Sequence, residues 1–427
     1  MTKPASSPDS TNLTPRVRLA YLVSHPIQYQ TPLLRRIAQE PDIDLTVFFG
    51  SDFSVRGYRD DGFGVEFKWD VPQLEGYRYE ILPTLRDNGS EGTWSPISHG
   101  LSARLAGQAG APPFDALWVH GYATVNQMHG ILAAKALGIP VLIRSDSSLR
   151  DRPRSGLKLA SKQIFFSALK SLIDGVLVSG TWNKLYWEHY LGEEFPLYLL
   201  PYAVDNEWFQ DQARLAVHRR AELQAELALE PGRPVILFAG KLQTRKHCDD
   251  LVEAYARLAA AEDSPGAYLL IVGDGEERPA IERQVAALGL RDVRFCGFRN
   301  QSELPRFFDL ATVFVLPAQH EPWGLIVNEV MNAGRAVILS DDVGCHPDLV
   351  THGVEGLIYP VRDVAALEAA LRAVLRDPET AAAMGQRGLA RISQWSFEQD
   401  VAGLRQALAQ VTGKLARDAS AGTEHRS

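Results

Sequence analysis

The run EPWGLIVNE at residues 321–329 indicates how this chain folds. It follows an apolar strand that ends at Leu316, and we expect a helix that begins near Gly324 or Leu325 and ends near Gly334. A glycine just after the last helical residue is typical of a helix C-terminus. A short apolar strand that leads into a helix is the repeating unit of α/β folds.

Two glutamates bracket this run and are candidate site residues. Glu321 is expected on the loop before the helix and Glu329 one to two turns inside it, so the two side chains do not share one helical face. We interpret the pair as contacting two parts of one ligand. The backbone N–H groups of Trp323, Gly324 and Leu325 could hold phosphate or sugar oxygens at the helix start. The alternative is an acidic first turn with one solvent-facing glutamate.

Strands and helices alternate through most of the chain, which predicts an α/β fold with parallel sheets covered on both faces. The linker between two such series is predicted near Pro201–Phe209, and residues 50–113 are less regular. In the second half, strands are predicted at Val235–Ala239, Tyr268–Val272, Val293–Cys296, Val313–Leu316, Ala336–Leu339 and Gly356–Ile358. In the first half, they are predicted at Arg18–Ser24, Asp44–Phe49, Ala116–Val119, Val141–Arg144 and Gly175–Ser179.

Composition is that of a water-soluble globular protein: 427 residues, 45% hydrophobic and 22% charged, with a formal net charge of −8. This charge argues against a general nucleic-acid binder.

The three cysteines lack the spacing of a disulfide framework or a zinc site and suggest a reducing cytoplasm. The first fifteen residues lack the apolar run of a signal peptide and are expected to be disordered. No apolar stretch has the length of a membrane span.

A basic loop follows the first strand of the second half. Gly240 allows a close backbone approach, and Lys241, Arg245 and Lys246 supply positive charge that could stabilise a diphosphate leaving group. The alternative is an exposed basic turn. Gly273 opens a Gly-x-Gly after the next strand, but this does not complete Gly-x-Gly-x-x-Gly, so a nicotinamide cofactor is not supported.

Polar residues also end the strands of the first half. Ser24 and His25 follow the first strand, His120 ends another and Arg144 the next. Because the carboxyl ends of parallel strands meet at one edge, we expect these residues to line one cleft. The alternative is that the histidines are structural.

A basic stretch runs from Arg144 to Lys170, with seven Lys or Arg residues and two Asp. Apolar residues are interleaved with the charges, which could form a surface that meets anionic lipid at the inner membrane face or a phosphate-bearing acceptor. The alternative is a solvated basic helix with an ordinary core face.

Together these motifs resemble the family-4 retaining glycosyltransferases of the GT-B fold, over roughly Arg16 to Val411. The resemblance rests on the two-glutamate run, on glycines after the strands, on Tyr202–Asp205 and on Gln394–Phe397. It implies two Rossmann-like domains facing across a cleft. The expected boundaries are a disordered segment 1–15, an acceptor-side domain 16–203, a nucleotide-sugar domain 204–392, a helix 393–412 that crosses back to the first domain and a flexible tail 413–427.

The resemblance also implies roles for single residues. His120, Lys246 and Glu321 would be catalytic; Glu321 would bond the donor sugar, and His120 would lie near sugar and acceptor. Ser24, His25 and Arg144 would belong to the acceptor or phosphate loop. The implied donor-binding residues are Lys241 at the diphosphate, Glu329 at the ribose, Phe298 at the base, and Gly240, Gly273, Trp323, Gly324 and Leu325.

The partners implied are a nucleotide-sugar donor and a glycan or glycolipid acceptor, in cell-surface polysaccharide biosynthesis, with no cofactor and no metal. The tripeptide Asp42-Ile43-Asp44 begins an early strand and lacks the context of a sugar-nucleotide metal site. Two departures from the family are Lys241 where an arginine is usual and a first loop without paired glycines. A nucleotide-sugar epimerase, a glycan phosphorylase and a non-catalytic nucleotide-sugar-binding protein stay open as alternatives.

Overall fold

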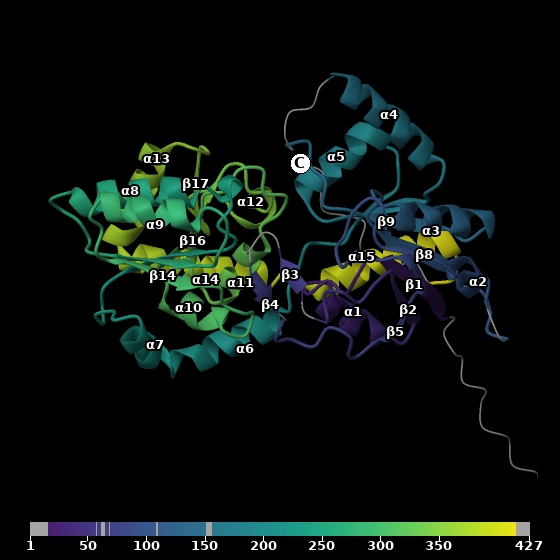
Figure 1. Ribbon diagram of the computed structural model, residues 1–427, viewed down its shortest axis with the longest axis horizontal. Coiled ribbons are helices and arrows are strands. Elements are labelled where there is room, and N and C mark those ends of the chain that lie inside the picture. Colours follow the sequence, from purple (N-terminus) through teal and green to yellow (C-terminus); the bar gives the residue numbers. More distant parts are fainter. Residues whose placement is uncertain are drawn as a thin grey trace, which may run out of the picture.

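A computed structural model describes residues 16–56, 58–60, 65–67, 69–107, 110–150 and 156–415. The predicted disordered segment 1–15 and residues 416–427 of the predicted flexible tail lie outside this range. The described chain forms two α/β units, each built on a parallel sheet (Figure 1). The predicted fold class is confirmed.

The first sheet contains seven parallel strands in the order β11-β10-β9-β8-β1-β2-β5. Helices α1 and α15 contribute side chains to the core on one face, and α2 to α5 to the core on the other. The strands are β1 (Val17–Val23), β2 (Ile43–Phe49), β5 (Arg78–Ile81), β8 (Ala116–His120), β9 (Val141–Arg144), β10 (Gly175–Val178) and β11 (Leu197–Leu199). The helices are α1 (Thr31–Ala38), α2 (Leu101–Leu105), α3 (Val125–Ala136), α4 (Gly156–Lys170) and α5 (Thr181–Leu191).

The second sheet has six parallel strands in the order β14-β13-β12-β15-β16-β17. They are β12 (Val235–Ala239), β13 (Tyr268–Val272), β14 (Val293–Gly297), β15 (Val313–Leu316), β16 (Ala336–Ser340) and β17 (Gly356–Tyr359). The helices are α6 (Asn206–Val217), α7 (Arg220–Glu226), α8 (Cys248–Ala260), α9 (Arg278–Ala287), α10 (Leu304–Leu310), α11 (Leu325–Asn332), α12 (His346–Leu349), α13 (Val364–Arg376) and α14 (Pro378–Ile392).

Both sheets share the strand order of doubly wound folds, in which the first and fourth strands of the sheet lie side by side at its centre. The chain reverses its direction of travel between β1 and β8 in one sheet and between β12 and β15 in the other. Ligands bind at such topological switch points, outside the carboxyl ends of the strands. The strands are apolar along their length because both faces are covered, and every residue of β12, β13 and β16 is buried.

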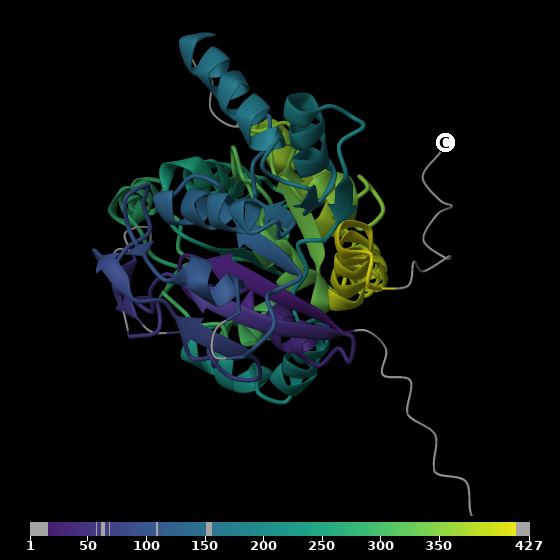
Figure 2. The same cartoon turned by 90° about the vertical axis from the view of Figure 1, so that its right-hand side faces the viewer.

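The last helix, α15 (Phe397–Thr412), leaves the second unit and packs against β10 and β11 of the first sheet. Figure 1 shows it as the yellow helix that runs behind that sheet, and Figure 2 shows it at one side of the sheet. The chain therefore passes between the units twice. At this crossing, the Trp395 indole N–H donates to the Tyr202 carbonyl at 3.0 Å, and the rings of Trp323 and Trp395 stack 5.6 Å apart.

The irregular segment 50–113 forms short pieces around the first sheet. Besides β5 and α2, it contains two small antiparallel pairs. These are β3 (Tyr58–Asp60) with β4 (Val65–Phe67), and β6 (Thr84–Arg86) with β7 (Ile97–Ser98). The Asp-x-Asp tripeptide begins β2, and Asp42 pairs there with Arg405 of α15 at 2.9 Å. This carboxylate therefore ties the last helix to the first sheet.

Candidate active site

Glu321 and two cations meet at the switch point of the second sheet. The loop after β12 makes a single 3₁₀ turn, Thr244–Lys246, which places two basic side chains beside the loop that follows β15. Lys246 Nζ and Arg245 Nη1 both donate to Glu321 Oε2, the latter at 2.7 Å. Burial raises the pKa of Glu321, but the charges of Lys246 and Arg245 outweigh it and hold the pKa below its ordinary value. Glu321 is therefore an ionised carboxylate between two cations.

The backbone holds Glu321 at the start of α11, as predicted. Glu321 N–H donates to the Asp342 carbonyl at 3.2 Å, and Gly344 N–H donates to the Glu321 carbonyl at 2.9 Å. A Cβ on Gly344 would lie 1.9 Å from the Pro322 carbonyl oxygen, so only glycine lets these two loops touch. The helix begins at Leu325 after Gly324, whose φ is +92°.

A cavity of about 300 Å³ lies over this cluster and between the two domains. Tyr29 and Trp69 come from the first domain, and the other walls come mainly from the carboxyl ends of β12, β13 and β14 and from the start of α11. The predicted residues that line it are Gly240, Lys241, Lys246, Gly273, Phe298, Glu321, Gly324, Leu325 and Glu329. The structure thus brings together nine predicted residues, from α11 and from the segments after β12, β13, β14 and β15.

Gly273 is required by the close approach of two strand ends beneath this cavity. Its φ is +131°, and a Cβ there would lie 1.9 Å from the carbonyl oxygen of Gly240. The absence of a Cβ on Gly273 lets the loops after β12 and β13 pack backbone against backbone. A ligand can therefore come close to the peptide groups on this side of the cleft.

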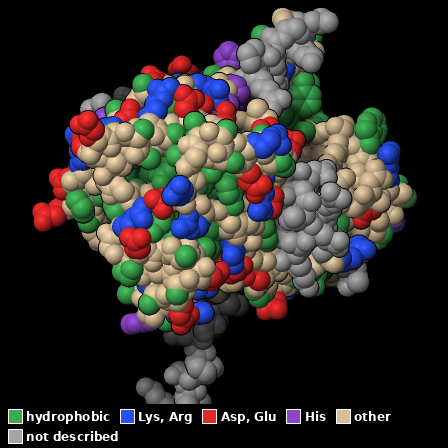
Figure 3. Space-filling view, turned by 60° about the vertical axis from the view of Figure 1, so that its left-hand side comes forward, with side chains coloured by type: hydrophobic (Ala, Val, Ile, Leu, Met, Phe, Trp, Pro, Cys, Tyr) green, Lys and Arg blue, Asp and Glu red, His purple; other side chains and the backbone are tan. Residues whose placement is uncertain are grey.

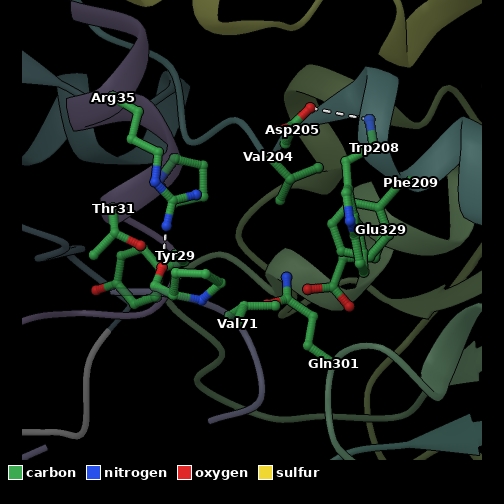
Figure 4. Close-up of a pocket in the computed structure, with 12 residues that line it drawn as sticks. Tyr29, Thr31, Arg35, Val71, Val204, Asp205, Trp208, Phe209, Gln301 and Glu329 are labelled. Carbon is green, nitrogen blue, oxygen red and sulfur yellow. Dashed lines mark hydrogen bonds between the residues drawn. The ribbon is translucent and has the colours of Figure 1, made fainter. Parts of the chain in front are cut away.

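Glu329 lies inside α11 and borders two cavities. Besides the first, it lines a second of about 270 Å³ together with Arg35, Trp208 and Phe209. Figure 4 shows its carboxylate beside the two aromatic side chains, across the cavity from Arg35 and Tyr29. Burial raises the pKa of Glu329 to about 8, and Oε2 has no hydrogen-bond partner among the described residues. A ligand hydroxyl could donate to this oxygen.

The predicted residues of the first domain meet at the other switch point. His120 ends β8 and His25 follows β1, its neighbour in the sheet. The Tyr21 hydroxyl lies 3.0 Å from His120 Nδ1, and the Ser24 hydroxyl lies 2.9 Å from His25 Nδ1. Burial, with the charge of Arg144, lowers the pKa of His120 to about 3, and burial, with His120 nearby, lowers that of His25 to about 4. Both imidazoles are neutral near pH 7.

Arg144 is not at the cleft surface, which corrects its assignment to an acceptor or phosphate loop. Its side chain is 1% exposed and borders neither of the two cavities at Glu329. The guanidinium donates to the Pro201 carbonyl at 3.2 Å, lies over the Tyr202 ring and approaches Asp400 of α15 to 3.9 Å. Arg144 therefore connects the crossing segment and the last helix beneath the cleft.

Trp323 is also corrected, because it packs in the core beside the site. Its ring stacks on Trp395 and Tyr202, and its indole N–H donates to Asn328 at 3.0 Å. Trp323 does not line the cavity that holds its neighbours Glu321 and Gly324. Its contribution is to fix the start of α11 against the interdomain crossing.

In the described part of the basic stretch, several cations contact other parts of the protein, and Ile164 of α4 is 73% exposed. Contact of this stretch with anionic lipid or a phosphate-bearing acceptor stays a prediction. Arg150 donates to the Asp341 carbonyl of the other domain at 2.6 Å, Lys162 lies over the rings of Tyr186 and Tyr190, and Lys170 donates to the Leu191 carbonyl. Residues 151–155 lie outside the described range. On the face in Figure 3, Lys and Arg side chains are interspersed with Asp and Glu. Among the described helices, none is both long and apolar enough to cross a membrane.

Sequence reasoning did not assign several residues that the site contains. Arg245 was noted only as a charge in the basic loop, and Tyr29 and Gln301 were not assigned although both border the two cavities at Glu329. Tyr21 lies inside β1 with 0% exposure, where an inward-facing tyrosine gives no signal of contact with a histidine. Only the pairing of β1 with β8 places it under His120.

Comparison with known structures supports the two-domain architecture. Over 94% of this chain and all of the other, the fold matches sucrose-phosphate synthase from Thermosynechococcus elongatus with a TM-score of 0.67 at 21% identity. It also matches Alr3699/HepE from Anabaena, solved in complex with UDP and glucose, with a TM-score of 0.64 at 17% identity and the same coverage. The two parallel-sheet domains have the GT-B fold of glycosyltransferases.

Residues 219–391 match the family model of Glycosyl transferases group 1. Alpha-D-kanosaminyltransferase of Streptomyces kanamyceticus is 32% identical over 162 residues, 38% of this chain and 41% of that protein. D-inositol 3-phosphate glycosyltransferase of Nocardia farcinica is 32% identical over 200 residues, 45% of this chain and 44% of that protein. The chain thus spans under half the length of these relatives. The match to the group 1 model lies within the second domain, and this match and these relatives support the prediction of a glycosyltransferase.

Proposed function

We propose that this protein is a family-4 glycosyltransferase that moves a sugar from a nucleotide-diphosphate sugar to an acceptor hydroxyl, with retention of anomeric configuration. One observation carries the proposal: Lys246 and Arg245 converge on ionised Glu321 at the wall of an interdomain cavity. The cations suit a diphosphate, and the carboxylate suits sugar hydroxyls. Glu329, with one unpartnered oxygen, suits the hydroxyls of a ribose.

The cluster can favour departure of the diphosphate. As the bond between the anomeric carbon and the diphosphate oxygen breaks, negative charge grows on that oxygen, where Lys246, Arg245 and Lys241 can stabilise it. The acceptor oxygen bonds to the same face of the anomeric carbon, and its proton passes to the departing oxygen. The transition state is oxocarbenium-like, as in other glycosyl transfer. This route needs no strong protein base, in keeping with the lowered pKa values of His25 and His120, which make both imidazoles weak bases.

The proposed acceptor is a glycan or glycolipid, in cell-surface polysaccharide biosynthesis in the cytoplasm, and no metal or cofactor takes part. The residues around the cavity are consistent with charge stabilisation by protein cations alone. Among the described residues, no group of three or more His, Cys, Asp or Glu side chains is placed to hold a metal ion.

A thermal-shift screen of nucleosides, nucleoside diphosphates and nucleotide sugars tests the proposal. A ligand at about 100 times its Kd stabilises the native state by about 2.7 kcal/mol, which is several degrees in Tm. We expect shifts from diphosphates and nucleotide sugars but not from nucleosides, and a smaller shift for Lys246→Ala. The ligand that gives the largest shift is then assayed for transfer to glycan acceptors. Conversion of that donor without acceptor would indicate an epimerase, and binding without any turnover a non-catalytic protein.

A further inference from the structure

Residues 69–72 of the first domain reach across the cleft and bond to the second domain. The Asp70 N–H donates to Asn300 Oδ1 at 3.4 Å, and the Ser302 N–H donates to Asp70 Oδ2 at 3.3 Å. The Ser302 hydroxyl donates to the same carboxylate oxygen. Both partners lie on the loop between β14 and α10. The first domain is therefore attached to the end of one strand of the second sheet.

The same segment is anchored to α1 on its other side. Arg35 Nε donates to the Glu75 carbonyl at 2.9 Å, and Arg35 Nη2 donates to the Pro72 carbonyl. Val71, which is labelled with Gln301 in Figure 4, lines the second cavity. Both domains thus hold this segment in place.

Trp69 lines the cavity of about 300 Å³ that also contains Glu321 and the basic loop. Trp69 is half-buried there. Its chain neighbour Asp70 bonds to the loop after β14, and consecutive Cα atoms are only about 3.8 Å apart. Trp69 therefore lies at the end of the cavity that this loop forms, where Phe298 and Leu304 are also lining residues.

The two ends of this cavity differ in charge. The cations on Glu321 lie beside the end of β15, which β12 and β13 separate from β14 in the sheet, a distance of about 14 Å at the usual strand spacing. At the β14 end, the guanidinium of Arg299 is engaged by the Cys296 carbonyl at 3.0 Å and by Glu303 at 3.2 Å. This aromatic and aliphatic end suits the flat face of a nucleobase, and the separation leaves room for a ribose before the diphosphate.

Resting on the proposed transfer from a nucleotide sugar, we propose that Trp69 stacks on the nucleobase of the donor across the cleft from Phe298, and that Asp70 is a positioning residue that holds the indole there. The base is then bound between the two domains. Stacking tolerates every base, so Trp69 favours a nucleoside diphosphate over a bare diphosphate without choosing among nucleotides. The two-glutamate run and the basic loop did not predict this contact, because Trp69 lies in the irregular segment 50–113.

The test uses the full chain and titration calorimetry with UDP, GDP, ADP and pyrophosphate. We expect Trp69→Ala to weaken the tightest-binding nucleotide about 5- to 150-fold, the effect of losing one base–aromatic stack, and to change pyrophosphate affinity less than about twofold. Trp69→Phe keeps an aromatic ring and should restore most of the affinity. Trp94→Ala is the matched control and should bind as the wild type does, since Trp94 is also in the irregular segment but is 62% exposed and lines neither cavity at Glu329.

A spectroscopic readout separates direct contact from an effect on folding. In protein labelled with 5-fluorotryptophan, the ¹⁹F resonance of Trp69 is identified by its absence from Trp69→Phe. The nucleotide should shift this resonance, and pyrophosphate should leave it unchanged. Asp70→Ala should reduce the shift and weaken nucleotide binding about three- to tenfold, the effect of losing one net hydrogen bond. Asp70→Asn keeps an acceptor for Ser302 and should restore both.

Nucleotide affinity within about twofold of the wild-type value in folded Trp69→Ala, or a Trp69 resonance that the nucleotide does not shift, would overturn this inference. Both readouts measure binding and need no turnover. A protein that binds its nucleotide through Trp69 but transfers no sugar would keep the inference and reject the proposed function. Sugar transfer with unchanged nucleotide affinity in Trp69→Ala would do the opposite, and a wild type that binds none of the three nucleotides would reject both.

Discussion

Replacing Lys246 by alanine removes one of the two cations that share a single oxygen of Glu321. Lys246 is 8% exposed and donates to Glu321 Oε2 together with Arg245. The local formal charge of the three side chains falls from +1 to zero. Glu321 keeps its bond to Arg245, so the variant does not leave a buried carboxylate without a partner.

The size of the effect follows from where the lost charge acts. A preorganised donor aimed at developing negative charge contributes about 2.7–4 kcal/mol, or about 10²- to 10³-fold in rate. The folding cost is expected to be smaller, about 1–2 kcal/mol, because the ion pair is only half removed. We therefore expect kcat for Lys246→Ala to fall at least about 100-fold while the protein stays folded.

The assay is the initial rate of nucleoside diphosphate release with the donor chosen by the thermal-shift screen, and urea unfolding is measured in parallel. Lys135→Ala is the matched control, since Lys135 also pairs with a carboxylate, Asp174 at 3.3 Å, but lies 40% exposed in the first domain. The kcat of Lys135→Ala should equal that of the wild type. A kcat within about threefold of wild type in folded Lys246→Ala would refute the role given to Lys246, because such a change is below about 1 kcal/mol.

Three further predictions concern the same cleft. The pKa of Glu329 is raised by burial from 4.5 in the unfolded chain to about 8, so its contribution to stability is complete below about pH 4.5 and is lost as the pH rises through 8. The Tm of the ligand-free protein should fall over this pH range, and the fall should be smaller in Glu329→Gln. Equal slopes of Tm against pH in the two proteins would contradict the raised pKa of Glu329. Gly273→Ala should abolish donor-induced thermal shifts, because its Cβ would clash with the Gly240 carbonyl, whereas Gly289→Ala, also at positive φ but with open space, should lose only a modest amount of stability. Transfer activity should be fully retained in excess EDTA, and its complete loss would show that a metal is needed.

The second domain could be predicted from sequence because its strands are buried on both faces. The apolar runs Val235–Ala239 and Tyr268–Val272 and the helix Leu325–Asn332 have the predicted bounds. The first domain was harder to predict from the sequence. Strand β5 is Arg-Tyr-Glu-Ile at the sheet edge, with three of its four residues exposed, so it carries no continuous apolar signal. The first turn of helix α6 fell within the predicted linker Pro201–Phe209, although Asp205 caps the helix by accepting from the Trp208 N–H.

The site could be predicted where glycines and charged residues follow the strands. Gly240, Lys246 and Glu321 follow strands that the fold places side by side, so their convergence follows from topology. Arg144 and Trp323 have similar positions in the sequence pattern, yet they face inward. Their orientation depends on partners more than 70 residues away in the chain, Asp400 and Trp395, which no local pattern reveals.

The position of α15 bears on how the protein is made. The side chains of Val401, Leu404 and Leu408 are buried in the core of the first sheet, so the part of that face beside α1 stays uncovered until α15 has been synthesised. The domain that leaves the ribosome first is therefore the one that completes its folding last, and it exposes apolar surface while the second domain is made. A chain that ends before residue 397 would leave the apolar surface under α15 exposed on the first domain.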